Sequence, residues 1–280
     1  TIVDLQGQIP TPLDTVKVAF VGHGTAEDPC WIAYQNGAET LAKSIRNVEV
    51  VFRYSKEDIA LQVDMVREEI ARGVDAIIVS IAHETALDAP VQEARDAGIV
   101  VIAFDTDDPE GAAGNARQAF VTSTITGKGI CYDTSYMRGE LVIDYFDGFP
   151  KGGHVFFPNE GPGATWSDQS RQGLVEYFEE RGYIKGEDWF LDEIDATYDV
   201  ATAEERITAY ILAHPEIDVI VPCGGCTSIA SVLAQEALEM EPEELPIFSW
   251  PHGPVDARGI RSGLVIAGVT DSHSNSGVLP

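Results

Sequence analysis

Aromatic residues and isolated aspartates follow the apolar runs of this sequence, where they could bind a small polar ligand. The aromatic residues are Trp31, Trp166, Tyr198 and Trp250, and the aspartates are Asp28, Asp105, Asp168 and Asp271. Nearby polar residues that can add hydrogen bonds are His23, Thr106 and His252. Carboxylates accept hydrogen bonds from hydroxyls, and aromatic rings stack on the C–H face of a sugar. The set favours a neutral polyhydroxy ligand, although the same groups also attract cations.

Each of these residues also suits a purely structural role. Asp28 precedes Pro29, a pattern typical of a helix N-cap followed by proline in the first turn, so Asp28 is a cap, a ligand contact or both. Trp31 lies on the same first turn and either packs on the sheet or faces a ligand. Asp105 suits a turn and Asp168 a helix cap. Taken together after strands, the residues favour a binding cleft.

The sequence contains no motif for nucleotide binding, hydrolysis or metal binding. A dinucleotide site needs G-x-G-x-x-G, but Gly22 and Gly24 are followed by Glu27 in place of the third glycine, and its charge would repel a pyrophosphate. The sequence contains no G-x-x-x-x-G-K-[ST], G-x-S-x-G or H-E-x-x-H, and no spacing resembles a calcium loop. We therefore expect no catalytic residue, no metal site and no cofactor.

Cys223 and Cys226 form the C-x-x-C pair of this sequence. At a helix start such a pair can have a lowered thiol pKa and support redox exchange. A local disulfide or two ordinary thiols in a loop explain the spacing better, because a lone C-x-x-C without a second pair or a thioredoxin-like context is weak evidence. An enzyme or sensor that uses this dithiol is therefore kept as an alternative function.

The residues that could bind a ligand must be positioned by two series of parallel strands. Continuous apolar runs, typical of strands buried on both faces, occur at 16–22, 48–54, 74–80, 99–105, 153–158, 188–194, 217–223 and 245–250. Amphipathic helical patterns separate them, for example over 57–72 and 201–214. We predict two Rossmann-like α/β halves with the ligand beyond the carboxyl ends of the strands. The polar, glycine-rich segment 107–129 is the expected hinge and linker.

The charge and length of the chain exclude further classes of function and favour two domains. The chain has 280 residues, which favours two domains, and a formal net charge of -28, which opposes binding to nucleic acid and anionic membranes. No apolar run approaches the roughly 18 residues of a membrane span. The sequence begins at Thr1 and contains no export signal of its own.

Motifs over nearly all of residues 16–277 resemble the type I periplasmic (solute) binding proteins of ABC transporters, in particular the ribose- and galactose-type sugar binders. The motifs are VAFVGHGTAEDPCWIAYQNGAETLA, RGVDAIIVSIAHETAL, DAGIVVIAFDTD, RQGLVEYFEERG, AHPEIDVIVPCGG and IRSGLVIAGVTDSHSNSG. The resemblance implies two three-layer α/β/α lobes joined by a hinge, with the ligand cleft between them. We expect an N-terminal arm (1–14), an N-terminal lobe (15–108 plus 272–280) and a C-terminal lobe (109–271).

The resemblance assigns contacts in the first lobe. The motif DPCW at 28–31 stands where the family has Asn-Pro-aromatic-aromatic, which implies that Trp31 stacks on the sugar while Cys30 replaces a second ring. Asp105 matches an aspartate that accepts sugar hydroxyls, and Thr106 stands where an arginine often follows.

The resemblance also assigns contacts in the second lobe and marks departures from the family pattern. Tyr198 and Trp250 fall on aromatic positions, and Asp271 falls on the polar residue of the last hinge crossing. Asp168 lies near the position of a sugar-binding arginine, and Gly224–Gly225 replaces the usual Asn-Asp. Because these changes remove donors that ribose binders use, a different pentose, a hexose or a polyol fits better.

The resemblance thus predicts a non-enzymatic protein that closes two lobes around a neutral monosaccharide or polyol and presents it to an ABC permease. It implies a monomer in the periplasm or outside the cell, free or lipid-anchored. One alternative is a LacI-type repressor effector domain, although no helix-turn-helix precedes residue 16. Another is a binder of a cationic or other small solute, such as an amino acid, a polyamine or a signalling molecule.

Overall fold

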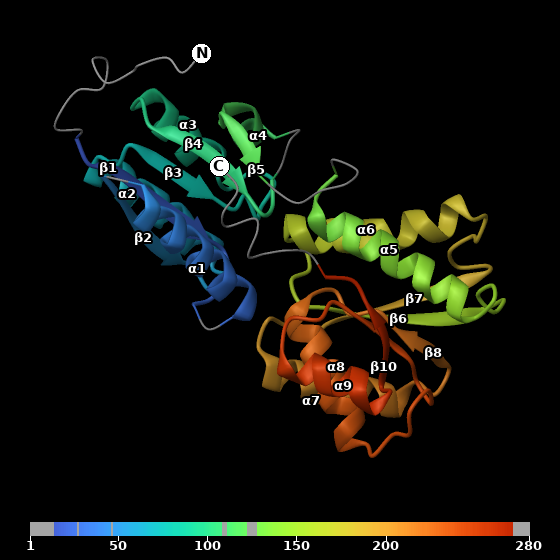
Figure 1. The fold of residues 1–280 in the computed structure, drawn as a ribbon. Helices are drawn as coiled ribbons and strands as arrows, with labels where there is room; N and C mark the ends of the chain where they lie inside the picture. The colour runs from blue at the N-terminus through green and yellow to red at the C-terminus, as the bar shows by residue number, and fades with distance from the viewer. Residues whose placement is uncertain (1–13, 27, 46, 108–110, 122–127, 271–280) are drawn as a thin grey trace, which may run out of the picture.

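The computed structural model describes residues 14–26, 28–45, 47–107, 111–121 and 128–270, which form two α/β lobes (Figure 1). Asp271, the segment 272–280 and all of the expected arm except Asp14 lie outside the described residues. The return of 272–280 to the first lobe therefore stays a prediction. Among the described helices, none has the length and apolar character that a membrane crossing requires.

The first sheet has five parallel strands in the order β2-β1-β3-β4-β5. The strands are β1 (Val16–Gly22), β2 (Val48–Tyr54), β3 (Ala76–Val79), β4 (Val100–Phe104) and β5 (Ala119–Val121). Four helices connect or follow them, namely α1 (Pro29–Ser44), α2 (Ile59–Arg72), α3 (Asp88–Asp96) and α4 (Ala112–Ala116). The four apolar runs expected in this half all form strands.

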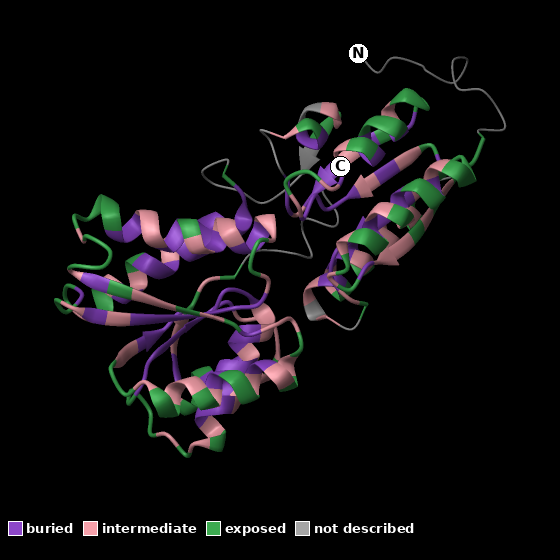
Figure 2. Cartoon of the chain, turned by 180° about the vertical axis from the view of Figure 1, so that it is seen from behind, coloured by how far each residue is buried: buried purple, intermediate pink, exposed green. Residues whose placement is uncertain are grey.

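Both faces of the first sheet carry helices, because alternate strand residues point to opposite sides. Ala19 and Val21 belong to a core that includes Val66 of α2 and Val91 of α3. Phe20, between them, belongs to an aromatic cluster with residues of α1. Figure 2 shows buried residues along the strands and exposed residues on the outer faces of the helices.

Polar caps and a glycine set the ends of the first helices. α1 starts after Asp28, whose side chain accepts a hydrogen bond from the Cys30 N–H, with Pro29 in the first turn, so the expected cap is confirmed. α2 starts after Asp58, which accepts from the Leu61 N–H at 3.0 Å. It ends at Gly73, whose φ of 68° lies in the left-handed region that favours glycine.

The second sheet has five parallel strands in the order β10-β9-β8-β6-β7. The strands are β6 (Gly153–Asn159), β7 (Trp189–Asp195), β8 (Ile217–Ile220), β9 (Ile247–Ser249) and β10 (Val265–Gly268). The helices α5 (Ile130–Tyr145) and α6 (Thr165–Glu180) cover one face, and α7 (Val200–Ala213), α8 (Gly225–Ala237) and α9 (Pro254–Ser262) cover the other (Figure 1). Phe157 and Phe156 of β6 belong to the cores on opposite faces.

The structure departs from the sequence expectations at two strands. Residues 119–121, inside the expected hinge, form β5 and pair with β4, so the first sheet extends past the expected lobe boundary at 108. The sequence pattern of β5 is too short to predict a strand, because β5 has only three residues. β10 pairs with β9 and was not predicted, although its run Val265–Gly268 is as apolar as the other strands.

Candidate functional site

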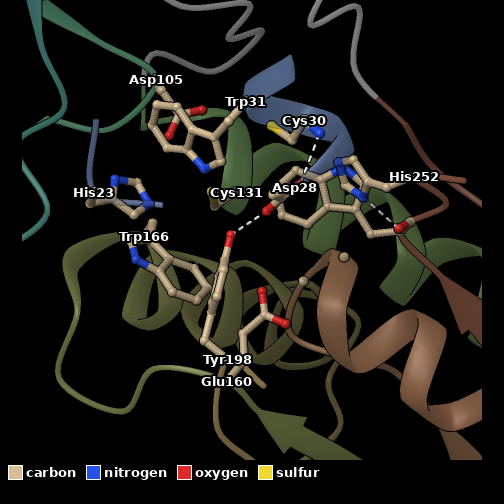
Figure 3. A pocket seen from close by; sticks show the side chains of 13 residues that line it. His23, Asp28, Cys30, Trp31, Asp105, Cys131, Glu160, Trp166, Tyr198 and His252 are labelled. Atoms are coloured by element: carbon tan, nitrogen blue, oxygen red, sulfur yellow. Dashed lines mark hydrogen bonds between the residues drawn. The ribbon is translucent and has the colours of Figure 1, made fainter. Parts of the chain in front are cut away.

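The carboxyl ends of the two sheets meet around a small cavity, the central cavity, of about 50 Å³ (Figure 3). From the first lobe it is lined by His23, Asp28, Cys30, Trp31 and Asp105. From the second lobe it is lined by Cys131, Glu160, Trp166, Tyr198, Gly224, Gly225, Trp250 and His252. The structure thus brings together eight of the eleven expected ligand contacts, which lie on both sides of the cleft.

Of the other three expected contacts, two do not line the central cavity and the third lies outside the described residues. Thr106 is buried, and its hydroxyl oxygen has no hydrogen-bond partner among the described residues. Asp168 lies in the first turn of α6, half-buried, where burial raises the pKa of its carboxyl. It is not the N-cap of that helix, which is Ala164. Asp271 lies outside the described residues, so its contact stays a prediction.

Asp28 serves two partners at once. One carboxylate oxygen accepts from the Cys30 N–H at 2.8 Å and caps α1. The other accepts from the hydroxyl of Tyr198, which comes from the second lobe after β7 (Figure 3). The cap and the contact with Tyr198 use different oxygen atoms of Asp28, whereas the expected contact of Asp28 with a ligand stays a prediction. The bond to Tyr198, called the Tyr198–Asp28 bridge below, ties the lobes together across the cleft.

Further contacts cross the cleft beside this bridge. The indole of Trp166 stacks on the His23 imidazole, with ring centroids 5.9 Å apart and an interplanar angle of 10°. The Thr165 N–H donates to the carbonyl oxygen of Ala82 at 3.2 Å. Hydrogen bonds and ring contacts therefore hold the two lobes together in this structure, and we call this arrangement closed.

His23 is a neutral hydrogen-bonding group in this wall. Burial lowers the pKa of its imidazole to about 3. The Ser80 hydroxyl oxygen accepts from the His23 N–H at 2.9 Å and from Gln62 Nε2 at 3.3 Å, and lies 2.9 Å from His23 Nδ1. Since that oxygen already accepts twice, its proton is best placed toward Nδ1, which leaves the ring proton on Nε2.

Trp31 is packed as tightly as a core residue although it lines the cavity. Its side chain is 2% exposed and makes edge contacts with Phe20 and Tyr34. Its indole also covers Gly22 and Gly24 so closely that a β-carbon at either position would overlap the ring. These two glycines are needed for a close approach of the indole to the backbone.

Glu160 is a site residue that the sequence analysis missed. It follows β6, is 6% exposed, and its Oε2 accepts from the Thr227 N–H in the first turn of α8 at 2.8 Å. Burial raises the pKa of its carboxyl to about 7. A β-carbon on Gly224 would overlap Glu160 Oε1, so the glycine makes room for the carboxyl. The position of Glu160 directly after a strand could have marked it as a candidate in the sequence. Its burial and its contact with α8 could not be seen there.

Carboxyl groups gather around the cavity, and two of them have raised pKa values. Asp28, Asp105 and Glu160 line it, and Glu57 lies near them. Burial and repulsion by these three carboxylates raise the pKa of Glu57 well above its usual range. The buried guanidinium of Arg138 lies behind Trp250, 5.8 Å from its ring, and outside the cavity lining.

Two helix N-termini that point at the cavity are already occupied by carboxylates. Asp28 caps α1, and Glu160 accepts from the first turn of α8. A helix N-terminus would otherwise attract an anion through its free N–H groups and its dipole. Because protein carboxylates hold these places, the site disfavours phosphorylated and other anionic ligands.

The C-x-x-C pair does not have the properties of a redox dithiol. Cys223 and Cys226 are both free thiols. Burial and the carboxylate of Glu160 raise the pKa of both, to about 12 for Cys223. The lowered pKa that redox exchange would need is therefore opposite to what the structure indicates.

Replacing Tyr198 with phenylalanine should open the ligand-free protein. The change removes the hydroxyl that donates to Asp28 and keeps the ring. A hydrogen bond to a charged group contributes about 1.5–3 kcal/mol, so the closed-to-open ratio should fall roughly 10- to 100-fold. Small-angle X-ray scattering should show a larger radius of gyration.

The matched control for this change is Tyr34→Phe. The Tyr34 hydroxyl also donates to an aspartate, Asp105, at 2.8 Å, but within the first lobe. Its loss should leave the radius of gyration unchanged. Equal radii for Tyr198→Phe and the unaltered protein would show that the bridge does not hold the lobes together.

A family model described as the periplasmic binding protein domain matches residues 18–270 of this chain. Among curated proteins, the D-galactose/methyl-galactoside binding periplasmic protein MglB of Haemophilus influenzae is 22% identical over 243 residues, which cover 84% of this chain and 71% of MglB. The xylose/arabinose-binding protein XylF of Sulfolobus acidocaldarius is also 22% identical, over 84% of this chain and 56% of XylF.

Solved structures share the fold at low sequence identity. An ABC transporter solute-binding protein from Agrobacterium vitis with bound D-fucose superposes with a TM-score of 0.81 at 18% identity, covering 94% of this chain and 86% of that chain. A periplasmic sugar-binding protein from Legionella pneumophila superposes with a TM-score of 0.79 at 20% identity, over 94% and 91% of the two chains. The two-lobed α/β fold expected from the sequence is confirmed.

Proposed function

We propose that this chain, which belongs to the periplasmic binding proteins, is a type I sugar-binding member of ABC transport systems. It captures a neutral monosaccharide or polyol between its lobes and delivers it to a membrane permease. Proteins of this family act in the periplasm. We propose an exported monomer that binds sugar without transforming it.

One observation carries the proposal: hydrogen-bond acceptors from both lobes converge on a single cavity walled by aromatic rings. Asp28 and Asp105 come from the first lobe, and Glu160 comes from the second. A ligand that bonds to both sets gains contacts only when the lobes close, so binding shifts the hinge equilibrium toward the closed form. Trp166 and Trp250 supply flat faces from the second lobe.

The ligand class follows from the polar groups that this wall offers. Carboxylates accept from hydroxyls, and the cavity-lining Trp250 keeps a buried indole N–H without an acceptor among the described residues. A hydroxyl both donates and accepts, so a polyol can satisfy both kinds of group. The sugar ligands named for MglB and for the Agrobacterium vitis protein support this class. The relatives favour neither the repressor nor the binder of cationic or other solutes.

Thermal melting against a panel of pentoses, hexoses, polyols, amino acids and polyamines tests the proposal. A ligand at a hundredfold its dissociation constant adds about 2.7 kcal/mol to the stability, so the matching sugar should raise the melting midpoint by several degrees. A shift with a polyamine or amino acid and with no carbohydrate would overturn the assignment.

A variant of a cavity-lining residue, compared with a matched control, shows whether the sugar binds in the central cavity. Asp105 has a left-handed backbone with φ 66°, which asparagine tolerates, so Asp105→Asn should keep the fold and weaken sugar binding at least tenfold. The exposed Asp147 also has a left-handed backbone, with φ 49°, but lies outside the cavity. Asp147→Asn should bind like the unaltered protein.

A further inference from the structure

One carboxyl group from each lobe contributes to a pair that spans the closed cleft. Glu57 belongs to the first lobe, in the loop between β2 and α2, and Glu160 follows β6 in the second lobe. Among the charged groups that repel Glu57, Glu160 acts most strongly. The side chain of Trp166, on α6, also faces Glu57 from the second lobe. The surroundings of the Glu57–Glu160 pair therefore depend on both lobes.

The backbone of the first lobe fixes Glu57 beside the cleft. Lys56 and Glu57 are consecutive residues with left-handed backbones, at φ 54° and 63°. The Glu57 N–H donates to the carbonyl oxygen of His23 at 2.7 Å, and the Lys56 N–H donates to that of Gly24 at 3.0 Å. A left-handed backbone is unfavourable for residues with side chains and persists where the surrounding contacts impose it. The loop thus holds Glu57 against the residues that follow β1.

Hydrogen-bond donors decide which of the neighbouring carboxyls can keep a charge. Asp28 accepts from a backbone N–H and from a tyrosine hydroxyl, and Asp105 accepts from another tyrosine hydroxyl. Glu160 accepts from a backbone N–H of α8. The Oε1 atom of Glu57 is buried and has no hydrogen-bond partner among the described residues. Because a buried carboxylate without donors is costly, a proton is best placed on the Glu57–Glu160 pair.

The positively charged groups nearby do not neutralise the pair. The described residues that line the central cavity include neither lysine nor arginine. His23 Nε2 lies 4.0 Å from Glu57 Oε1, beyond a hydrogen bond, and burial keeps the imidazole neutral. Arg138 attracts Glu160 from behind Trp250, but its guanidinium donates to two backbone carbonyls and a serine hydroxyl. Burial raises the pKa of the other groups that face the pair and keeps them neutral, namely Tyr198, Cys223 and Cys226.

We propose that the Glu57–Glu160 pair binds a proton when the lobes close, so that acidification favours the closed form. The inference rests on the hinge motion of the proposed function. In an open form each carboxyl is better hydrated and is no longer repelled by the other lobe, so it holds a proton less tightly. Glu57 does not line the central cavity, and its proton therefore reports closure and not a contact with the ligand.

The direction of the pH effect follows from linkage. Because the closed form binds the proton more tightly, its advantage is complete below the pKa of the open form and is lost as the pH rises through that of the closed form. In the closed form the pKa of Glu160 is about 7, and that of Glu57 lies well above its usual range. The closed-to-open ratio should therefore fall as the pH rises from 5.5 to 8. Each pKa unit between the two forms changes this ratio tenfold.

Small-angle X-ray scattering of the chain without any sugar, at pH 5.5 and pH 8, tests the proposal. The unaltered protein should have a larger radius of gyration at pH 8. Glu57→Gln, which is neutral at both pH values, should have the same radius at both. Glu57→Asn, a residue that tolerates the left-handed backbone, is a second neutral variant should the first not fold.

Two controls show which group responds to pH. Glu179→Gln, at an exposed position on α6, should keep the pH response of the unaltered protein. His252 lines the central cavity and, as an imidazole, can titrate in this range, so His252→Asn is the second control and should also keep the response. A response that Glu57→Gln keeps and His252→Asn loses would assign the effect to the imidazole and overturn the proposal.

The outcomes separate this inference from the proposed function. Equal radii of the unaltered protein at pH 5.5 and pH 8 overturn the proton coupling, and a sugar that raises the melting midpoint still supports the function. A panel in which no carbohydrate binds overturns the function, whereas the scattering, which uses no sugar, still decides the coupling. A radius that grows with pH in the unaltered protein and in both controls, but not in the neutral Glu57 variants, supports the coupling.

Discussion

Replacing Trp31 with alanine should lower the free energy of unfolding by about 3–5 kcal/mol and also weaken sugar binding. The large effect on stability is expected because the indole is 2% exposed and packs among Phe20, Tyr34 and His23. Its removal would leave a void beside Gly24, since both glycines that face the ring lack a side chain to fill it. Urea unfolding followed by circular dichroism measures the change.

Two control variants separate packing from ligand contact. Trp189→Ala removes a fully buried indole from the core of the second lobe, outside the central cavity, so it should lower stability by a similar amount without changing the affinity of the folded protein. Trp31→Phe should retain part of the packing and lose less stability. An unfolding free energy unchanged in Trp31→Ala would mean that the indole only stacks on the ligand.

The family resemblance implies only that Trp31 stacks on the sugar. A residue that only stacks on a ligand should be removable at little cost to the ligand-free protein. In the structure, the same indole forms part of the cavity wall and of the first lobe's aromatic cluster. Its two contributions therefore share one side chain, and a loss of binding by itself would not identify Trp31 as a ligand contact.

Glu160→Gln should flatten the dependence of stability on pH between about 4.5 and 7. In the folded protein burial raises the pKa of Glu160 from 4.5 to about 7, so the folded state binds the proton more tightly than the unfolded state. The stability from this group is fully present below pH 4.5 and is lost as the pH rises through 7. The loss amounts to about 3 kcal/mol, since each pKa unit corresponds to about 1.4 kcal/mol.

The measurement is the unfolding free energy of both proteins at several pH values from 4 to 8. Glutamine keeps one oxygen that can accept from Thr227, so the variant should become more stable relative to the unaltered protein as the pH rises. Glu179→Gln, at an exposed position on α6, should run parallel to the unaltered protein. Parallel curves for Glu160→Gln would contradict the raised pKa.

Much of the site could be predicted because parallel sheets place their carboxyl ends at one edge. Once the apolar runs are recognised as strands, the residues after them become neighbours in space, as His23 after β1, Asp105 after β4 and Trp250 after β9 show. The cap at Asp28 was equally local, because Asp-Pro before a helix is a pattern of adjacent residues.

Other features depended on contacts between residues far apart in the chain. The environment of Glu160 arises from α8, 67 positions away at Thr227, and its raised pKa comes from burial that local sequence does not encode. Burial also raises the pKa of the Cys223 thiol, whereas a C-x-x-C motif by itself would suggest a lowered pKa.

The sequence by itself therefore determined the two-lobed α/β fold, the strands that end at the cleft and the acidic, aromatic character of the site, since these follow from periodicity and from residues adjacent to strands. Only the tertiary structure decided that Tyr198 bonds to Asp28 across the cleft, that Trp31 belongs to the core, and that Glu160 accepts a hydrogen bond from the first turn of α8. The reason is physical: hydrogen-bond pairing, burial and cavity volume are set by how the two lobes pack, and no single segment contains that information.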